Sequence, residues 1–324
     1  MKKYMLALGL SLLTVLGLFT GCSPKAETAS GSDSLKIVAT IFPEYDWVRQ
    51  VLGDRAGEVE LTLLLDSGTD LHSYQPTAAE MLTIGECDLF LYNGGESDAW
   101  VERVLATAAN PDRRTLSVME VLGDSVLEEE VVEGMQEAED HDHAEGEAHE
   151  EEADEHVWLS LRNARTACAE IARVLGELDP DHAAEYQTNA ENYMAQLEAL
   201  DGEYTALAEN AARRTVLVGD RFPFRYLMDD YGLEYYAAFS GCSAETEASF
   251  ETIAFLSGKT EELALPCILT TESPQPGVAE TIRSNTASGD QTILQLDSMQ
   301  SAGTGDNYLD IMKENLEVLR QALA

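Results

Sequence analysis

The first part of the chain alternates short apolar runs with amphipathic segments. Four runs have the composition of buried strands: LKIVAT (35–40), VELTLLL (59–65), CDLFLYNG (87–94) and RTLSVME (114–120). Segments of helical character lie between them, at 43–53, 77–85 and 96–109. Buried strands that alternate with helices predict a parallel sheet with α/β packing.

Two helices are predicted in the middle of the chain, over 161–178 and 181–211. The second has apolar residues at alternating steps of four and three, which is typical of one continuous helical face. These residues are Tyr186, Ala190, Tyr193, Leu197, Leu200, Tyr204 and Leu207. A helix of about thirty residues is on the order of 45 Å long, so we expect it to connect two lobes.

Beyond residue 211 the alternation of strands and helices begins again. Strands are predicted at 214–220, 233–239, 267–273 and 291–297, and helices at 222–232, 249–265, 276–287 and 307–324. The predicted fold class is therefore α/β, with two parallel-sheet lobes joined by a long rigid helix and a cleft between the lobes. The expected boundaries are 35–178 for the first lobe, 179–211 for the linking helix and 212–324 for the second lobe.

An acidic stretch interrupts the first lobe at about 127–155. It lacks apolar periodicity and cannot bury enough apolar surface to offset the entropy of ordering it, so we expect a mobile loop. His141, His143 and His149 lie in this stretch. We expect these imidazoles to attract or transfer metal weakly.

The amino terminus has the pattern of a lipoprotein signal. Two lysines precede an apolar stretch, and small residues lead to Cys22. We predict a signal peptide over 1–21, lipidation of Cys22 and a flexible tether over 22–34, which would place the protein outside the cytoplasm and anchor it to the cell membrane. An uncleaved membrane anchor is the alternative.

Charge and cysteine content narrow the possible partners. The chain has 60 acidic and 20 basic residues, a formal net charge of −40, which repels nucleic acid and anionic lipid surfaces and suits cations. The cysteines beyond Cys22 form no C-x-x-C pair, and both disulfides and buried free thiols are compatible with their spacing. They are Cys87, Cys168, Cys242 and Cys267.

Candidate metal ligands lie at the carboxyl ends of the predicted strands, where ligands of open α/β sheets gather. His72 follows the second strand, Asp220 and Asp297 end two strands of the second lobe, and His156 follows the acidic loop. Each has a plainer interpretation as an exposed histidine or a helix cap. Together, two imidazoles and two carboxylates suit a divalent transition metal.

Four features resemble the cluster of metal-binding lipoproteins that serve zinc and manganese ABC importers. They are DLHSYQPT (70–77), EHVWLSLRNA (155–164), the Tyr/Leu face of the long helix and the ending at 296–323. The resemblance covers essentially the whole mature chain, although Leu71 stands where the family usually has proline. It implies two α/β lobes, a rigid connecting helix and one metal ion in the cleft. By motif it assigns His72 and His156 to the first two ligand positions and Asp297 to the aspartate, and the histidine-rich loop resembles that of the zinc-uptake members.

The remaining ligand departs from the family pattern. Where the family has histidine or glutamate, this chain has Asp220 or Arg221, depending on the direction of counting. A guanidinium has no lone pair for a metal, so Asp220 is the prediction, with Glu245, Glu247 and water as alternatives. Two carboxylates favour manganese or iron, whereas the histidine-rich loop favours zinc. We predict Zn²⁺, with Mn²⁺ as the alternative.

The predicted function is that of a solute-binding lipoprotein, expected to be monomeric, which captures a metal ion and delivers it to an ABC permease without a chemical step. A secreted metal-dependent hydrolase is one alternative, since a site with an open position can activate water. The chain contains no H-E-x-x-H or G-x-S-x-G motif to support that alternative. A role in cell adhesion is a further alternative, compatible with the anchor and the charge.

Overall fold

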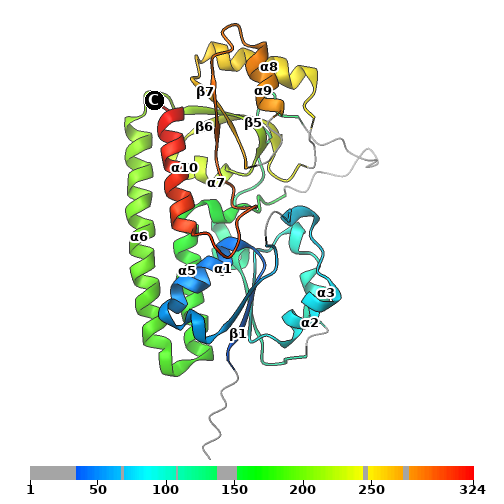
Figure 1. The fold of residues 1–324 in the computed structure, drawn as a ribbon, viewed down its shortest axis with the longest axis vertical. Coiled ribbons are helices and arrows are strands. Elements are labelled where there is room, and N and C mark those ends of the chain that lie inside the picture. The colour runs from blue at the N-terminus through cyan, green and yellow to red at the C-terminus, as the bar shows by residue number, and fades with distance from the viewer. Residues whose placement is uncertain (1–33, 67–68, 107–108, 137–151, 244–246, 273–276) are drawn as a thin grey trace, which may run out of the picture. The chain divides into compact units, whose positions relative to one another are not determined.

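Two four-stranded parallel sheets form the framework of the chain (Figure 1). The computed structural model describes residues 34–66, 69–106, 109–136, 152–243, 247–272 and 277–324. Residues Ser34–Ala324 form one compact unit. The predicted α/β class with parallel sheets is confirmed.

The first sheet has the strand order β2-β1-β3-β4, and each strand lies within one of the predicted apolar runs. The strands are β1 (Lys36–Ala39), β2 (Glu60–Leu63), β3 (Leu89–Tyr92) and β4 (Arg114–Ser117). The accompanying helices are α1 (Phe42–Leu52), α2 (Ala78–Glu86), α3 (Val101–Leu105) and α4 (Val118–Leu122). We call this sheet with its helices lobe 1. Because every pairing is parallel, the carboxyl ends of the four strands meet at one edge.

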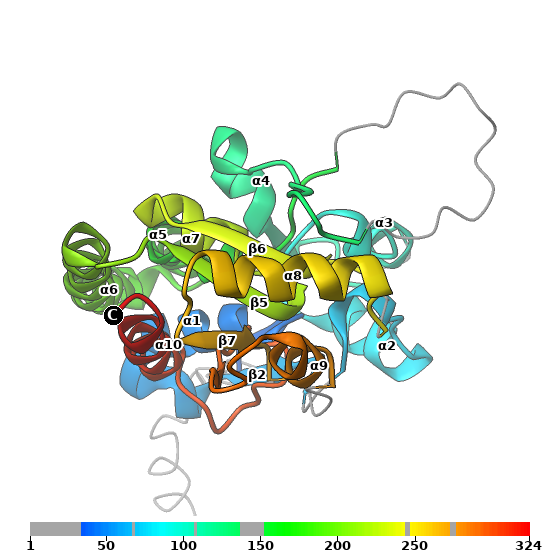
Figure 2. The same ribbon diagram turned by 90° about the horizontal axis from the view of Figure 1, so that it is seen from above.

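The second sheet has the order β6-β5-β7-β8 and, with its helices, forms lobe 2. Helices α8 and α9 pack beside β5, β6 and β7 (Figure 2). The strands are β5 (Thr215–Phe222), β6 (Glu234–Ser240), β7 (Cys267–Thr270) and β8 (Thr292–Gln295). The helices are α7 (Arg225–Tyr231), α8 (Phe250–Glu262), α9 (Gly277–Asn285) and α10 (Tyr308–Ala322).

Strand β5 is longer than the sequence indicates. It continues past Asp220 to Phe222, and its pairing with β6 shifts register between Val218 and Arg221. Asp220 therefore lies within the strand, at the irregularity, and does not end it.

Helices α5 (Leu161–Leu178) and α6 (Ala183–Asn210) occupy the two predicted helical ranges. The predicted apolar face of α6 is buried from Tyr186 to Tyr204 and ends on Ala208, whereas Leu207 is only partly buried. This face contacts α5 and α1 at one end and α10 and α7 at the other (Figure 1). Among the described residues, no helix combines the length and the apolar character needed to cross a bilayer.

The segment between His156 and α5 ties the two lobes together. The buried Trp158 donates its indole N–H to the carbonyl of Ser298 over 2.9 Å. The buried Tyr308, at the start of α10, donates its hydroxyl to the carbonyl of Trp158 over 2.7 Å. These buried hydrogen bonds fix the segment before α5 against the loop after β8 and the start of α10.

The ordered chain extends further into the predicted acidic loop than the sequence indicates. Glu128 pairs with Ala153 in an antiparallel bridge, and the backbone N–H of Gln136 donates to the carbonyl of Ala238 on β6. The boundary predicted near residue 127 is therefore too early, because pairing with a strand about 100 residues away cannot be seen in local composition. Residues 137–151, with His141, His143 and His149, lie outside the described residues, as do the predicted signal, Cys22 and the tether.

Candidate metal site

A short 3₁₀ turn, Leu71–Ser73, positions His72 after β2. Asp70 caps this turn by accepting the backbone N–H of His72 over 3.0 Å. The other carboxylate oxygen of Asp70 accepts a hydrogen bond from Arg221 of lobe 2 over 2.9 Å. Partial burial works against ionisation of Asp70, but the hydrogen bond and charge of Arg221, together with the backbone N–H of His72, outweigh it and lower the pKa of this carboxyl. The turn that carries His72 is thus held from both lobes.

The His72 imidazole has partners on only one of its nitrogens. Nδ1 lies 2.9 Å from the hydroxyl of Ser97 and 3.3 Å from a carboxylate oxygen of Glu155. Glu155 also accepts the Ser97 hydroxyl and, over 2.8 Å, the Ser97 backbone N–H. With a proton on Nδ1, the lone pair is on Nε2. That Nε2 is buried and has no hydrogen-bond partner.

His156 is fully buried and is backed by a carboxylate in the same way. Asp154 accepts the backbone N–H of His156 over 2.8 Å and lies 3.0 Å from its Nδ1. Asp154 is in turn fixed by the Tyr226 hydroxyl, which donates to its carbonyl over 2.8 Å. The Nε2 of His156 lies 3.4 Å from the side-chain amide nitrogen of Gln300. A carboxylate on one ring nitrogen, with the lone pair on the other, is the usual arrangement of a metal-binding histidine.

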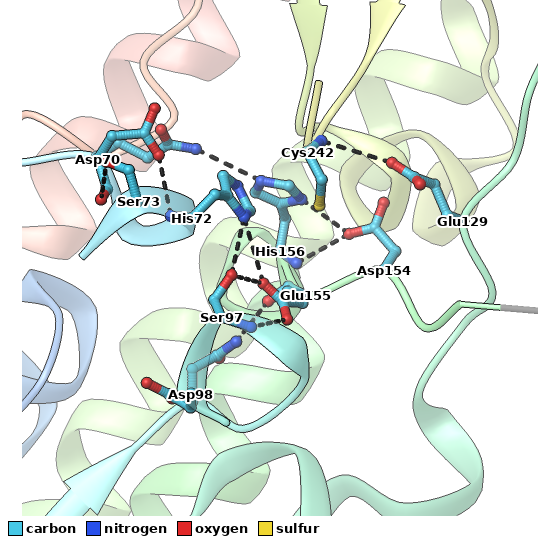
Figure 3. Close-up of polar contacts among 12 residues, drawn as sticks. Asp70, His72, Ser73, Ser97, Asp98, Glu129, Asp154, Glu155, His156 and Cys242 are labelled. Atoms are coloured by element: carbon cyan, nitrogen blue, oxygen red, sulfur yellow. Dashed lines mark hydrogen bonds and ion pairs between the residues drawn. The ribbon is translucent and has the colours of Figure 1, made fainter. Parts of the chain in front are cut away.

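The two imidazoles lie next to one another, with ring centroids 5.3 Å apart and ring planes tilted by 60° (Figure 3). Cys242, in the loop after β6, completes a group with them. One ligand atom from each of His72, His156 and Cys242 lies within 4.8 Å of the other two. Among the described residues, this is where potential metal ligands converge. Burial, together with nearby carboxylates led by Glu129, raises the pKa of the Cys242 thiol.

Asp220 makes other contacts and is not in this group. One of its oxygens accepts the Thr271 hydroxyl over 2.8 Å, and the other accepts the backbone N–H of Arg221 over 2.9 Å. These hydrogen bonds connect β5 to the loop after β7.

Asp297 also lies outside the group of three. It accepts the backbone N–H of Met299 over 2.7 Å, and burial, helped by the neighbouring Glu272, raises its pKa to about 6. Glu272 itself accepts the hydroxyl of Ser298 and the backbone N–H groups of Ser298 and Gln300. The loop that follows β8 is thereby shaped so that Gln300 reaches His156.

The remaining alternatives from the sequence can also be placed. Arg221 points to Asp70, Glu247 is exposed, and Glu245 lies outside the described residues. The four cysteines beyond residue 33 are free thiols.

A cavity of about 150 Å³ is lined by Thr69 and Asp70 of lobe 1 on one side, and it reaches the histidines through Asp70 and Gln300, which contact His72 and His156. Lobe 2 provides the rest of the lining, including Arg221, Gly241 and Gln300. The cavity is therefore built by loops at the carboxyl edges of both sheets, where α/β proteins hold their ligands.

Sequence reasoning missed Cys242, Gln300 and the carboxylates behind the histidines. Cys242 comes two residues after β6, so the rule that identified His72 at a strand end would have identified it as well. Asp154 and Glu155 could not be singled out from the sequence, because the acidic stretch before His156 contains many other carboxylates. Burial of those two carboxylates is a tertiary property that composition does not report.

Comparison with known proteins supports the resemblance noted in the sequence. The family described as zinc-uptake complex component A, periplasmic, matches residues 37–322. The zinc-binding lipoprotein AdcA of Streptococcus pneumoniae is 32% identical over 323 residues, 99% of this chain. The chain spans only 61% of the length of that relative. The high-affinity zinc uptake system protein ZnuA of Bacillus subtilis is 29% identical and is covered over 91% of its length.

A solved structure agrees with these sequence matches. The Zn(II)-bound ZnuA-like domain of S. pneumoniae AdcA superposes with a TM-score of 0.69 at 27% identity. The alignment covers 90% of this chain and 99% of that domain.

Proposed function

Because the chain belongs to the family of periplasmic zinc-uptake component A proteins, we propose that it captures a divalent transition metal outside the cytoplasm and delivers it to an ABC permease. The proposed ion is Zn²⁺, and it is cargo, so no chemical step is required. We propose His72 and His156 as two of its ligands. The lipid anchor at Cys22 and a monomeric state belong to this proposal as sequence-based expectations.

One observation carries the proposal: two imidazoles lie next to each other, and each has its Nδ1 beside a carboxylate. Glu155 and Asp154 occupy that position for His72 and His156, at 3.3 and 3.0 Å. In this arrangement the lone pair of each ring is on Nε2, which is buried and unpartnered in His72 and lies beside the Gln300 amide in His156. An unpartnered buried nitrogen costs on the order of 1–3 kcal/mol of stability, and a bound cation removes that cost at His72.

The location of the site suits capture and release. His72 and His156 lie on loops at the carboxyl edges of the sheets, and the adjoining cavity has walls from both lobes. A small separation of the lobes would therefore open the cavity without unfolding either sheet. The relatives named for zinc binding and zinc uptake favour zinc as the cargo.

The proposal is tested by equilibrium competition of Zn²⁺ against a chromophoric chelator, using the mature protein. We expect one tightly bound ion per chain and at least about a 100-fold weaker affinity in His72→Ala and His156→Ala. His182→Ala is the matched control, because His182 pairs with Asp179 over 2.8 Å as His156 pairs with Asp154, but lies at the start of α6. Unchanged affinity in both site variants, or equal loss in the control, contradicts the proposal.

A further inference from the structure

We propose that Cys242 supplies the third protein ligand to the cargo ion, so that the site is formed by two imidazoles and one thiolate. This inference rests on the proposed function, because it takes His72 and His156 as ligands. It differs from the sequence-based prediction, which completed the site with two carboxylates, Asp297 and, as the remaining ligand, Asp220.

The geometry already brings the sulfur to the histidines. A ligand atom of each of the three residues lies within 4.8 Å of the others. Around a tetrahedral zinc ion, nitrogen and sulfur ligands are separated by roughly 3.4 to 3.6 Å, given their bond lengths. Movements on the order of 1 Å are therefore enough to close the group around an ion.

Gly241 makes this approach possible. A Cβ atom at this position would lie 2.7 Å from Cε1 of His156 and 2.9 Å from the carbonyl oxygen of Phe222. Both distances are shorter than van der Waals contact, so any other residue would force the loop away from His156. Glycine lets the backbone lie against the imidazole ring, and the next side chain, Cys242, is carried to the site (Figure 3).

Cys242 is also the residue that lobe 2 contributes to this group. His72 and His156 both belong to the first part of the chain, and Asp220 is engaged by Thr271. Arg221 extends to Asp70 and has no lone pair. Among the described residues of lobe 2, Cys242 is the one whose ligand atom lies in the group with His72 and His156. A metal–sulfur bond would therefore join the two lobes through the ion.

Sulfur also narrows the range of ions that this site would hold. Thiolate is a soft ligand that suits zinc and disfavours manganese, magnesium and calcium, whereas a carboxylate in the same position favours those harder ions. The thiolate thus provides a chemical reason for selecting zinc. The fourth position is left for the side chain of Gln300, near His156, or for water.

Cobalt(II) substitution tests the inference directly, because thiolate ligation produces an intense near-ultraviolet charge-transfer band. We expect the band in the wild-type protein, its loss in Cys242→Ser and its retention in Cys267→Ser. Cys267 is the matched control: it is a free, buried thiol of lobe 2 at the amino end of β7, away from the carboxyl edge. We also expect Cys242→Ser to weaken Zn²⁺ binding by at least about tenfold and to narrow the preference for Zn²⁺ over Mn²⁺.

Protection from a thiol reagent gives a second measurement that needs no variant. Bound Zn²⁺ should slow alkylation of Cys242 in the native protein, as located by peptide mass analysis. A wild-type cobalt complex without the band, or a band that survives in Cys242→Ser, overturns the inference, as does equal alkylation with and without Zn²⁺. In those cases His72-dependent binding of one ion still upholds the proposed function, whereas absence of any tight binding contradicts that function itself.

Discussion

The individual side chains around the histidines determine how the site can work. His72 and His156 lie far apart in the sequence, yet a carboxylate from the two residues just before His156 orients each of them. Glu155 serves His72 across the fold, and Asp154 serves His156 within its own turn. Both histidines could be proposed from sequence because they lie at strand and loop ends. Their orientation could not, because the Glu155–His72 contact depends on how the acidic segment packs.

Removal of the Asp154 charge tests this orientation. We expect Asp154→Asn to weaken Zn²⁺ binding by about 10- to 100-fold, because a neutral amide no longer holds the Nδ1 proton as firmly or raises the basicity of Nε2. Competition titration measures the loss. Asp179→Asn alters the equivalent pair with His182 and should leave affinity unchanged; a similar loss in both variants would show that the Asp154 contact is not specific.

At the scale of elements, the strands of the two described sheets and the long helices follow from apolar patterning, because these strands are rich in apolar residues that helices cover. The ends of elements were less predictable. β5 extends past Asp220 because its pairing with β6 resumes at Arg221 after the shift in register. The segment near Gln136 is ordered by Ala238, on a strand that comes much later in the chain. Such long-range pairing leaves no periodicity in the local sequence.

The start of α1 gives a prediction of pH dependence. Glu44 is fully buried and accepts backbone N–H groups of Thr40 and Ile41, and burial raises its pKa to about 8. In the unfolded chain the same group ionises near 4.5. The native state therefore keeps this proton to a higher pH than the unfolded chain does. The contribution of protonated Glu44 to stability is complete below about pH 4.5 and is lost as the pH rises through about 8.

We accordingly expect the free energy of unfolding of the metal-free protein to fall by an amount on the order of a few kcal/mol between pH 5 and pH 8, and to fall less in Glu44→Gln. Urea titrations at several pH values measure this difference. The exposed Glu86, at the end of α2, provides the control Glu86→Gln. Parallel pH profiles for Glu44→Gln and wild type would contradict the assignment.

The acidic loop provides a second prediction about a segment. If His156 is the ligand and His141, His143 and His149 are auxiliary, replacing residues 137–151 with a short Gly/Ser linker should leave one tightly bound Zn²⁺ per chain. Residues 128–129 and 152–153 pair with each other, which preserves the base of the loop. Competition titration of the shortened protein measures this. Loss of the tight site on shortening would assign that site to the loop.

At the scale of the molecule, the site depends on two lobes brought together by buried contacts. The Trp158 and Tyr308 hydrogen bonds join the lobes behind the site, and the Arg221–Asp70 ion pair joins them beside the cavity. The partly exposed ion pair contributes on the order of 1 kcal/mol, so the buried contacts carry most of this connection. An ion bound by residues of both lobes adds to it.

This coupling predicts that metal stabilises the whole unit. Zn²⁺ at about 1,000 times its dissociation constant should add about 4 kcal/mol to the free energy of unfolding, which corresponds to a rise in Tm on the order of 10 °C. Calorimetry of wild type and His156→Ala, with and without Zn²⁺, measures it. An equal rise in the variant would place the stabilising ion elsewhere.

The central claim is that the cargo ion lies between His72 and His156, and it is tested most directly by anomalous diffraction at the zinc absorption edge from crystals of the zinc-loaded protein. We predict one strong anomalous peak per chain, within about 2.0–2.1 Å of Nε2 of both histidines. A fully occupied peak elsewhere, with these two nitrogens free of metal, would contradict the account.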